Sequence, residues 1–254
     1  YDWVTVRKAS HKGVTLATNL NFLPTDHHNI AYQAAELLKH DYPQVGGVDL
    51  RIHKCIPVAA GMAGGSTDAA AVLYGMNKLW RLGIPMQRLM EYGLQIGADV
   101  PFCLLRGTAL AEGIGEELTS LPPMPGCYVL IAKPPVSVST KLVYQTLDAL
   151  KRPQHPPIDA QIQDLEAQDL QSLAAHMGNV LEDVTIPMHP QITQIKQLMI
   201  AQGALSAMMS GSGPTVFGIF LDKTKAYKAK EQIRNSGLAK QVYVTKPYNK
   251  EINR

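Results

Sequence analysis

A glycine-rich segment, residues 57–67 with the sequence PVAAGMAGGST, constrains the fold of this chain more than any other feature. Before it, Val48, Leu50 and Ile52 alternate with polar residues, which predicts a half-buried strand. After it, apolar residues recur at helical spacing from Val72 to Trp80. A strand is therefore expected to enter this segment and a helix to leave it.

The chemistry of such a segment favours an anion. A helix start leaves backbone N–H groups unpaired and carries a partial positive charge, and small residues before it let an anion approach closely. Ser66 and Thr67 add hydroxyl groups that cap a helix or bind phosphate. No lysine follows Gly65, which excludes the GxxxxGK[ST] loop, and Ala63 excludes the GxGxxG loop. A tight turn beneath a closely packed helix remains the alternative.

The remaining periodicity predicts two α+β lobes. The first half adds a strand at residues 1–7, a helix starting near Ile30, and another helix over 85–96 that Gly97 ends. Outside an insert at about 135–185, the second half reads strand, helix, strand, strand, helix, strand, the order of a ferredoxin-like fold. These elements are expected at residues 127–133, 192–199, 205–210, 215–221, 224–235 and 241–245. The insert is expected to hold a loop at 154–157 and one helix over 162–176.

Composition excludes several classes of protein. A net charge of +3 is too small to argue for nucleic-acid binding, and the sequence contains no run of 18 apolar residues that would span a membrane. Cys55, Cys103 and Cys127 are dispersed without a CxxC pair, which predicts buried free thiols in a reducing compartment, so we expect a cytoplasmic protein. Because Tyr1 is not a methionine and a strand is already under way there, we expect the biological N-terminus to lie upstream.

Four segments resemble the GHMP kinase superfamily. Residues 57–67 are similar to its second motif, and residues 209–215 (MSGSGPT) are similar to its third. Residues 96–102 (IGADVPF) and 107–113 (GTALAEG) narrow the resemblance to the 4-diphosphocytidyl-2-C-methyl-D-erythritol kinases, and it extends over essentially the whole chain. It implies an α+β, two-lobed GHMP kinase fold. Residues 1–110 would form a ribosomal-protein-S5-like, ATP-binding domain and residues 111–254 a ferredoxin-like domain.

The resemblance also implies a reaction and a set of residues. The family uses ATP and Mg²⁺ to phosphorylate a hydroxyl of the methylerythritol part of a small cytidine diphosphate substrate, in the non-mevalonate route to isoprenoid precursors. Asp99 matches the catalytic aspartate, which takes or orients the hydroxyl proton, although an aspartate here could equally cap a turn. The positions that match the ATP-binding loop are Pro57, Val58, Ala59, Ala60, Gly61, Met62, Ala63, Gly64, Gly65, Ser66 and Thr67.

Further positions match the nucleotide and substrate pockets. Asn29 and Lys54 match residues that line the family's nucleotide pocket. Alternatively, Asn29 caps the helix that begins there and Lys54 is an ordinary exposed strand lysine. Tyr144 matches an aromatic residue that stacks on the cytosine, and Thr140 would hydrogen-bond the base or its sugar. The expected contacts with substrate or phosphates at the hairpin turn are Gly211, Ser212 and Gly213.

The sequence also contains histidines near residue 27 and lacks two of the family's motifs. His27 and His28 are expected to face solvent, Ser66 is one candidate to face Mg²⁺, and the Mg²⁺ ligands are otherwise unassigned. The family's first motif, a PAKxNL-type segment with the catalytic lysine, and its DGYH-type segment do not occur in these residues. Another GHMP kinase, of the homoserine or mevalonate type, and a nucleotide-binding module without catalysis therefore remain alternatives. No nucleic-acid or membrane partner is expected, and a homodimer is left open.

Overall fold

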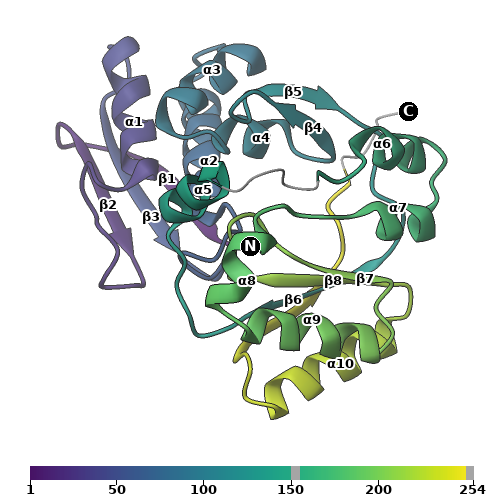
Figure 1. Ribbon diagram of the computed structural model, residues 1–254. Coiled ribbons are helices and arrows are strands. Elements are labelled where there is room, and N and C mark those ends of the chain that lie inside the picture. The colour runs from purple at the N-terminus through teal and green to yellow at the C-terminus, as the bar shows by residue number, and fades with distance from the viewer. Residues whose placement is uncertain (150–154, 250–254) are drawn as a thin grey trace. The chain divides into compact units, whose positions relative to one another are not determined.

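The computed structural model describes residues 1–149 and 155–249, which divide into two compact units (Figure 1). One unit comprises residues 1–58 and 63–120, and the other comprises residues 59–62 and the chain from residue 121 onward. The glycine-rich segment thus contributes residues to both units.

The first unit contains a three-stranded sheet in the order β1-β3-β2, with β3 at its centre. Strand β3 (Gly47–His53) pairs antiparallel with β1 (Trp3–Ala9) and parallel with β2 (Val14–Thr18). Helices and a β-hairpin complete the unit: α1 (Ile30–Asp41), α2 (Gly64–Leu79), α3 (Met86–Ile96), α4 (Val100–Leu105), β4 (Ala109–Glu112) and β5 (Glu117–Ser120). The predicted strands and the three predicted helices of this half are confirmed, whereas β2, α4 and the hairpin were not predicted.

Apolar and polar residues alternate along β3, and the apolar ones form part of the core of this unit. Val48, Leu50 and Ile52 are all buried, as the sequence pattern predicted. Helices α1 and α2 pack against each other and bury small residues, including Ala31 and Ala69, which let their backbones approach closely. Each fully buried Leu or Ile stabilises the fold by about 1.5–3 kcal/mol. This packing fixes α2 against the rest of the first unit.

The second unit contains a four-stranded antiparallel sheet in the order β7-β8-β6-β9. Helices α9 and α10 lie on one face of this sheet (Figure 1), and residues of both belong to its buried core. The chain order strand, helix, strand, strand, helix, strand confirms the ferredoxin-like prediction. The elements are β6 (Tyr128–Lys133), α9 (Gln191–Ala201), β7 (Ser206–Met209), β8 (Val216–Phe220), α10 (Lys223–Asn235) and β9 (Gln241–Thr245).

The insert in this unit differs from the prediction of one helix over 162–176. Two helices occur there, α6 (Ile158–Glu166) and α7 (Leu170–His176), because Gln168 has a φ of 57° and Asp169 starts a new helix. The Asp169 carboxylate caps α7 by accepting hydrogen bonds from the N–H groups of Gln171 at 3.0 Å and Ser172 at 3.1 Å. Two further helices were not predicted, α5 (Thr140–Ala149) and α8 (Glu182–Met188). Residues 155–157 of the predicted loop are irregular, and residue 154 lies outside the described residues.

The domain boundary and the burial of the cysteines differ in part from the predictions. The predicted boundary after residue 110 falls inside β4, which pairs with β5, so the contacts of the first unit continue to Ser120. Burial of the cysteines is confirmed for Cys127 and wrong for Cys55, which is exposed in the turn after β3. Among the helices of the described residues, none combines the length and the apolar character needed to cross a bilayer.

Candidate active site

The backbone of the glycine-rich segment adopts a left-handed turn before α2 and leaves most of its N–H groups without partners among the described residues. Ala59, Gly61 and Ala63 have φ values of 50°, 66° and 48°, a left-handed conformation that costs a non-glycine residue about 1–3 kcal/mol. Within the described residues, none of the N–H groups of residues 59–66 is hydrogen-bonded to the protein. Adjacent N–H groups without partners at a helix start attract an anion, because the helix dipole adds positive charge there. The geometry therefore supports an anion site and not merely a tight turn.

The two hydroxyl groups of this segment behave differently. The Thr67 hydroxyl donates to the carbonyl oxygen of Ala63 at 2.9 Å and lies 3.4 Å from Cys103 Sγ. The Ser66 hydroxyl has no hydrogen bond to any described residue, and no side chain caps α2, which begins after Ala63. Capping by Ser66 is therefore wrong, and its oxygen is available to a ligand.

In the second unit, the other half of the segment packs against the MSGSGPT turn. Ser210 donates a hydrogen bond from its hydroxyl to the carbonyl oxygen of Gly61 at 2.7 Å. A Cβ at position 61 would lie 2.5 Å from the Ser210 carbonyl oxygen and 3.1 Å from that of Gly213. Only glycine fits such an approach. The structure thus joins two predicted motifs that are far apart in the sequence.

Asp99 immediately precedes α4 in the first unit. Its side chain is exposed and makes no capping hydrogen bond, so the interpretation as a turn-capping aspartate is wrong. Its carbonyl oxygen accepts from the N–H of Cys103 at 3.1 Å, and Cys103 in turn contacts Thr67 at the start of α2. Burial raises the pKa of the Cys103 thiol, and the negative charges of Asp99 and Asp68 raise it further. Asp99 is therefore an accessible carboxylate close to the start of α2.

Lys54 is not the exposed strand lysine of the simpler interpretation. Only 5% of its side chain is exposed, and its ammonium group binds the carboxylates of Asp2 and Asp68, the latter at 2.7 Å. Burial lowers the pKa of Lys54, but the hydrogen bonds to these carboxylates outweigh it and leave the pKa raised. Burial also raises the pKa of Asp68 to about 6, despite the opposing effect of Lys54. Asp2 and Asp68 were not among the predicted site residues.

The segment before α1 carries a cap and an exposed polar cluster. The Asn29 side chain caps α1, accepting from the N–H of Ala31 at 3.0 Å and donating to another carbonyl, so its nucleotide-binding role stays a prediction. His27 and His28 are exposed, as predicted. With Asp26 they bring possible metal-ligating atoms within 4.8 Å of one another, but one Asp26 oxygen already accepts from the ring of His28 at 3.0 Å.

The predicted substrate residues of the second unit lie close together. The hydroxyl groups of Thr140 and Ser212 are hydrogen-bonded at 2.8 Å, and Ser212 is buried. Tyr144 follows Thr140 by one turn of α5, so both occupy the same face of the helix, and its side chain is 52% exposed. Gly211 and Gly213 have φ values of 55° and 86°, which the hairpin turn requires.

Sequence reasoning missed two residues that hold this turn. Asn179 donates from its side-chain amide to the carbonyl oxygens of Met209 at 2.9 Å and Gly211 at 2.8 Å. Glu182, at the start of α8, accepts from the N–H of Met209 at 2.7 Å and binds Lys196. No sequence signal points to them, because their contacts join residues 27 to 32 positions apart.

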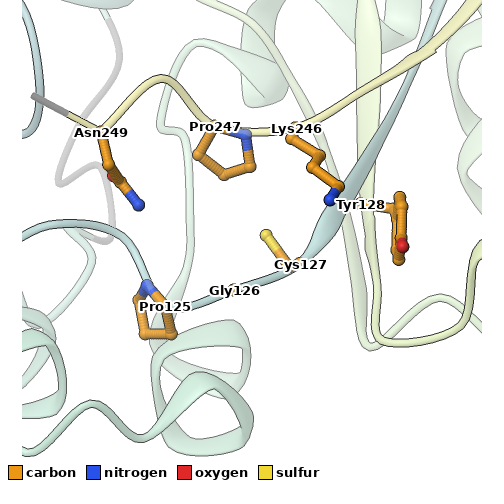
Figure 2. Close-up of a pocket in the computed structure, with 7 residues that line it drawn as sticks. All are labelled: Pro125, Gly126, Cys127, Tyr128, Lys246, Pro247 and Asn249. Atoms are coloured by element: carbon orange, nitrogen blue, oxygen red, sulfur yellow. The ribbon is translucent and has the colours of Figure 1, made fainter. Parts of the chain in front are cut away.

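An open cavity of about 280 Å³ lies elsewhere in the second unit, as Figure 2 shows. It is found where β6 begins and where the chain continues beyond β9, and none of the predicted site residues lines it. Its lining residues are Pro125, Gly126, Cys127, Tyr128, Lys246, Pro247 and Asn249. We therefore do not assign the predicted chemistry to this cavity.

Comparison with known proteins agrees with these motifs. The family described as GHMP kinases N terminal domain matches residues 29–107, and that described as GHMP kinases C terminal matches residues 161–239. A protein of Lachnospira eligens named 4-diphosphocytidyl-2-C-methyl-D-erythritol kinase is 52% identical over 98% of this chain and 86% of its own length. A protein of the same name from Lachnoclostridium phytofermentans is 49% identical over 97% of this chain and 84% of its own length.

Solved structures extend the comparison to the fold. A crystal structure of 4-(cytidine 5'-diphospho)-2C-methyl-D-erythritol kinase matches with a TM-score of 0.80 and 30% identity, over 96% of this chain and 85% of that chain. A homoserine kinase from Cytophaga hutchinsonii has a TM-score of 0.81 at 20% identity, over 98% of this chain and 86% of that chain, and shows the fold alone. By its two GHMP kinase domains, its α+β fold and its similarity to these relatives, the chain belongs to the 4-diphosphocytidyl-2-C-methyl-D-erythritol kinase family of the GHMP kinases.

Proposed function

We propose that this chain is an ATP-dependent kinase that phosphorylates the methylerythritol hydroxyl of 4-diphosphocytidyl-2-C-methyl-D-erythritol, a step in making isoprenoid precursors. The observation that carries the proposal is the run of unbonded N–H groups over residues 59–66 at the start of α2. Relatives at 52% and 49% identity that bear this enzyme's name support the choice of substrate.

In the proposed reaction the acceptor hydroxyl oxygen forms a bond to the γ-phosphorus of ATP, the bond to the bridging oxygen breaks, and ADP leaves. The unbonded N–H groups of residues 59–66 bind phosphate oxygens and stabilise the charge that develops on them. Asp99 takes or orients the proton of the acceptor hydroxyl, a role that its exposed and uncapped carboxylate suits. Both contributions require that the N–H groups and the Asp99 carboxylate are positioned before the reaction. The left-handed turn positions the N–H groups, and the start of α4 positions Asp99.

The residues at the start of α2 also suit Mg²⁺. This ion prefers oxygen ligands and binds through few protein groups together with substrate phosphates. Ser66 offers a hydroxyl oxygen without a protein partner, whereas the carboxylate of Asp68 already binds Lys54. Ser66 would therefore hold the ion together with the ATP phosphates, and the bound ion would neutralise charge on the transferred group.

We place recognition of the cytidine part on α5 and the hairpin turn. The half-exposed ring of Tyr144 offers a flat surface that suits a neutral pyrimidine base. The hydroxyl pair of Thr140 and Ser212 can hydrogen-bond the base or its sugar, and the glycines beside Ser212 let a ligand approach the backbone. A cytoplasmic location and a homodimer stay predictions.

The test incubates the full-length protein with Mg²⁺, ATP and 4-diphosphocytidyl-2-C-methyl-D-erythritol, and measures ADP and the phosphorylated product. Homoserine and mevalonate serve as competing acceptors in parallel reactions. Turnover with the cytidine substrate alone supports the proposal. Turnover with homoserine or mevalonate instead would assign the chain to another GHMP kinase activity, and ATP binding without any turnover would leave a nucleotide-binding module.

A further inference from the structure

Three charged side chains of the first unit, Asp2, Lys54 and Asp68, form a buried ionic cluster. The exposed fractions of their side chains are 1%, 5% and 5%. Moving an ion out of water costs several kcal/mol, so buried charges persist only where partners surround them. The ammonium group of Lys54 binds both carboxylates, and it lies 2.7 Å from the Asp68 oxygen. This cluster is not used in the reaction proposed above.

The cluster is bonded directly to the residues that lead into the glycine-rich segment. The second oxygen of the Asp2 carboxylate accepts hydrogen bonds from the N–H groups of Cys55 at 2.6 Å and Ile56 at 2.8 Å. These are the last two residues before Pro57, where the segment begins. Asp2 therefore fixes the backbone immediately before the turn.

The same cluster reaches the far side of the turn. Asp68 belongs to α2, five residues into its sequence, so its contact with Lys54 joins the chain before the turn to the helix after it. A Cβ at Gly64 would lie only 3.3 Å from Lys54 Nζ and 3.0 Å from Ile56 Cγ2. The first residue of α2 is thus packed directly on the cluster.

We propose that Asp2, Lys54 and Asp68 are positioning residues, which hold the backbone on both sides of the glycine-rich segment in the conformation that binds ATP. The inference rests on the proposed function of that segment. Lys54 then acts through the backbone and does not bind the phosphates itself. The charge of the cluster supports a positioning role for Lys54 over direct phosphate binding. At neutral pH two carboxylates surround one ammonium group, so the cluster carries a net negative charge and cannot attract an anion by its own field.

The two possible roles of Lys54 predict changes of opposite sign. If Lys54 bound ATP phosphates, neutralising Asp2 or Asp68 would free positive charge and strengthen ATP binding. If the cluster positions the backbone, the same changes weaken ATP binding, because Lys54 loses a charged partner. Asp2→Asn should have the larger effect, since its amide nitrogen must face either the Lys54 ammonium group or the N–H groups of Cys55 and Ile56.

The experiment measures the Kd for MgATP by calorimetry, and kcat and KM with the cytidine substrate, in the full-length protein. We expect Asp68→Asn and Asp2→Asn each to raise the Kd by about tenfold or more, the scale of one charge-assisted hydrogen bond. Asp49→Asn is the matched control, because Asp49 lies on β3 but its carboxylate is exposed and bonds Thr15 and His11. Its Kd should equal that of the wild type.

Each outcome decides one question. A lower Kd in the Asn variants, or an unchanged Kd with a lower free energy of unfolding, would overturn the positioning role. A wild-type protein that binds no MgATP would instead overturn the proposed function. Hydrogen exchange at the amides of Cys55 and Ile56 gives a readout without nucleotide: Asp2→Ala should speed it, whereas unchanged exchange would show that Asp2 does not hold this backbone.

Discussion

The hydroxyl group of Ser210 donates a hydrogen bond to the carbonyl oxygen of Gly61 at 2.7 Å, across 149 residues of sequence. It joins the glycine-rich segment to the hairpin turn of the second unit, two segments that carry predicted ligand contacts. Neither can move alone without losing this bond. Mutations at either segment should therefore alter nucleotide binding and substrate binding together.

Gly61→Ala should weaken ATP binding without unfolding the protein. The new Cβ would lie 2.5 Å from the Ser210 carbonyl oxygen, and the φ of 66° adds strain of about 1–3 kcal/mol. We expect the Kd for MgATP, measured by calorimetry, to rise at least about tenfold. Gly126→Ala is the control, since nothing lies within 4 Å of a Cβ there. Equal Kd values for both variants would contradict the role given to Gly61.

Asp99→Asn should separate catalysis from binding. Its carboxylate is exposed and bonds no other described side chain, so its loss should leave the free energy of unfolding unchanged. We expect kcat to fall by roughly 100- to 10,000-fold, the usual contribution of a general base. The Kd for MgATP should stay close to that of the wild type. If ATP binding falls as far as kcat does, Asp99 supports the structure and does not act on the proton.

Asp68 should make stability depend on pH. Because burial raises its pKa to about 6, the folded protein binds this proton more tightly than the unfolded chain does. Its contribution to stability is thus largest below about pH 4 and is lost as the pH rises through about 6. Between pH 4.5 and 7.5, urea unfolding should show wild type losing roughly 2 kcal/mol relative to Asp68→Asn. Parallel pH profiles for the two proteins would contradict the raised pKa.

Asn179→Ala should loosen the hairpin turn. It removes both donors to the carbonyl oxygens of Met209 and Gly211, at a cost of roughly 1–3 kcal/mol in the free energy of unfolding. We also expect a higher KM for the cytidine substrate, measured at saturating ATP. Asn235→Ala, at the exposed end of α10, is the control. A stability loss without any change in KM would limit Asn179 to a role in folding.

Tyr144→Ala should raise the KM for the cytidine substrate selectively. Stacking of a base on an aromatic ring contributes about 1–3 kcal/mol, and the half-exposed Tyr144 ring has little to lose in folding stability. Tyr144→Phe should keep most of the affinity, because it keeps the ring. Tyr243→Ala, at another half-exposed tyrosine on β9, is the control. Equal KM values in the Ala and wild-type proteins would exclude stacking at this position.

Local patterns predicted the elements whose signal lies within a few residues. The alternation of Val48, Leu50 and Ile52 defined β3, and proline and glycine at the two ends of α3 defined its bounds. Helix α4 was missed because it has only six residues and follows α3 after a short turn. The single helix expected over 162–176 was wrong because the cap at Asp169 outweighs the helical spacing around it.

The sequence by itself determined the order of the strands and helices that form the sheet of the second unit, the family, and Asp99 as a candidate catalytic carboxylate, because each depends on neighbouring residues or on a contiguous motif. Only the tertiary structure decided what surrounds those residues. Lys54 reads as an exposed strand residue until folding brings Asp2, 52 positions away, against its ammonium group. Likewise Asn179 meets Gly211 across 32 positions. Such contacts depend on packing between elements. The cost of burying each polar or charged group is offset by partners distant in the sequence, and local periodicity does not predict those partners.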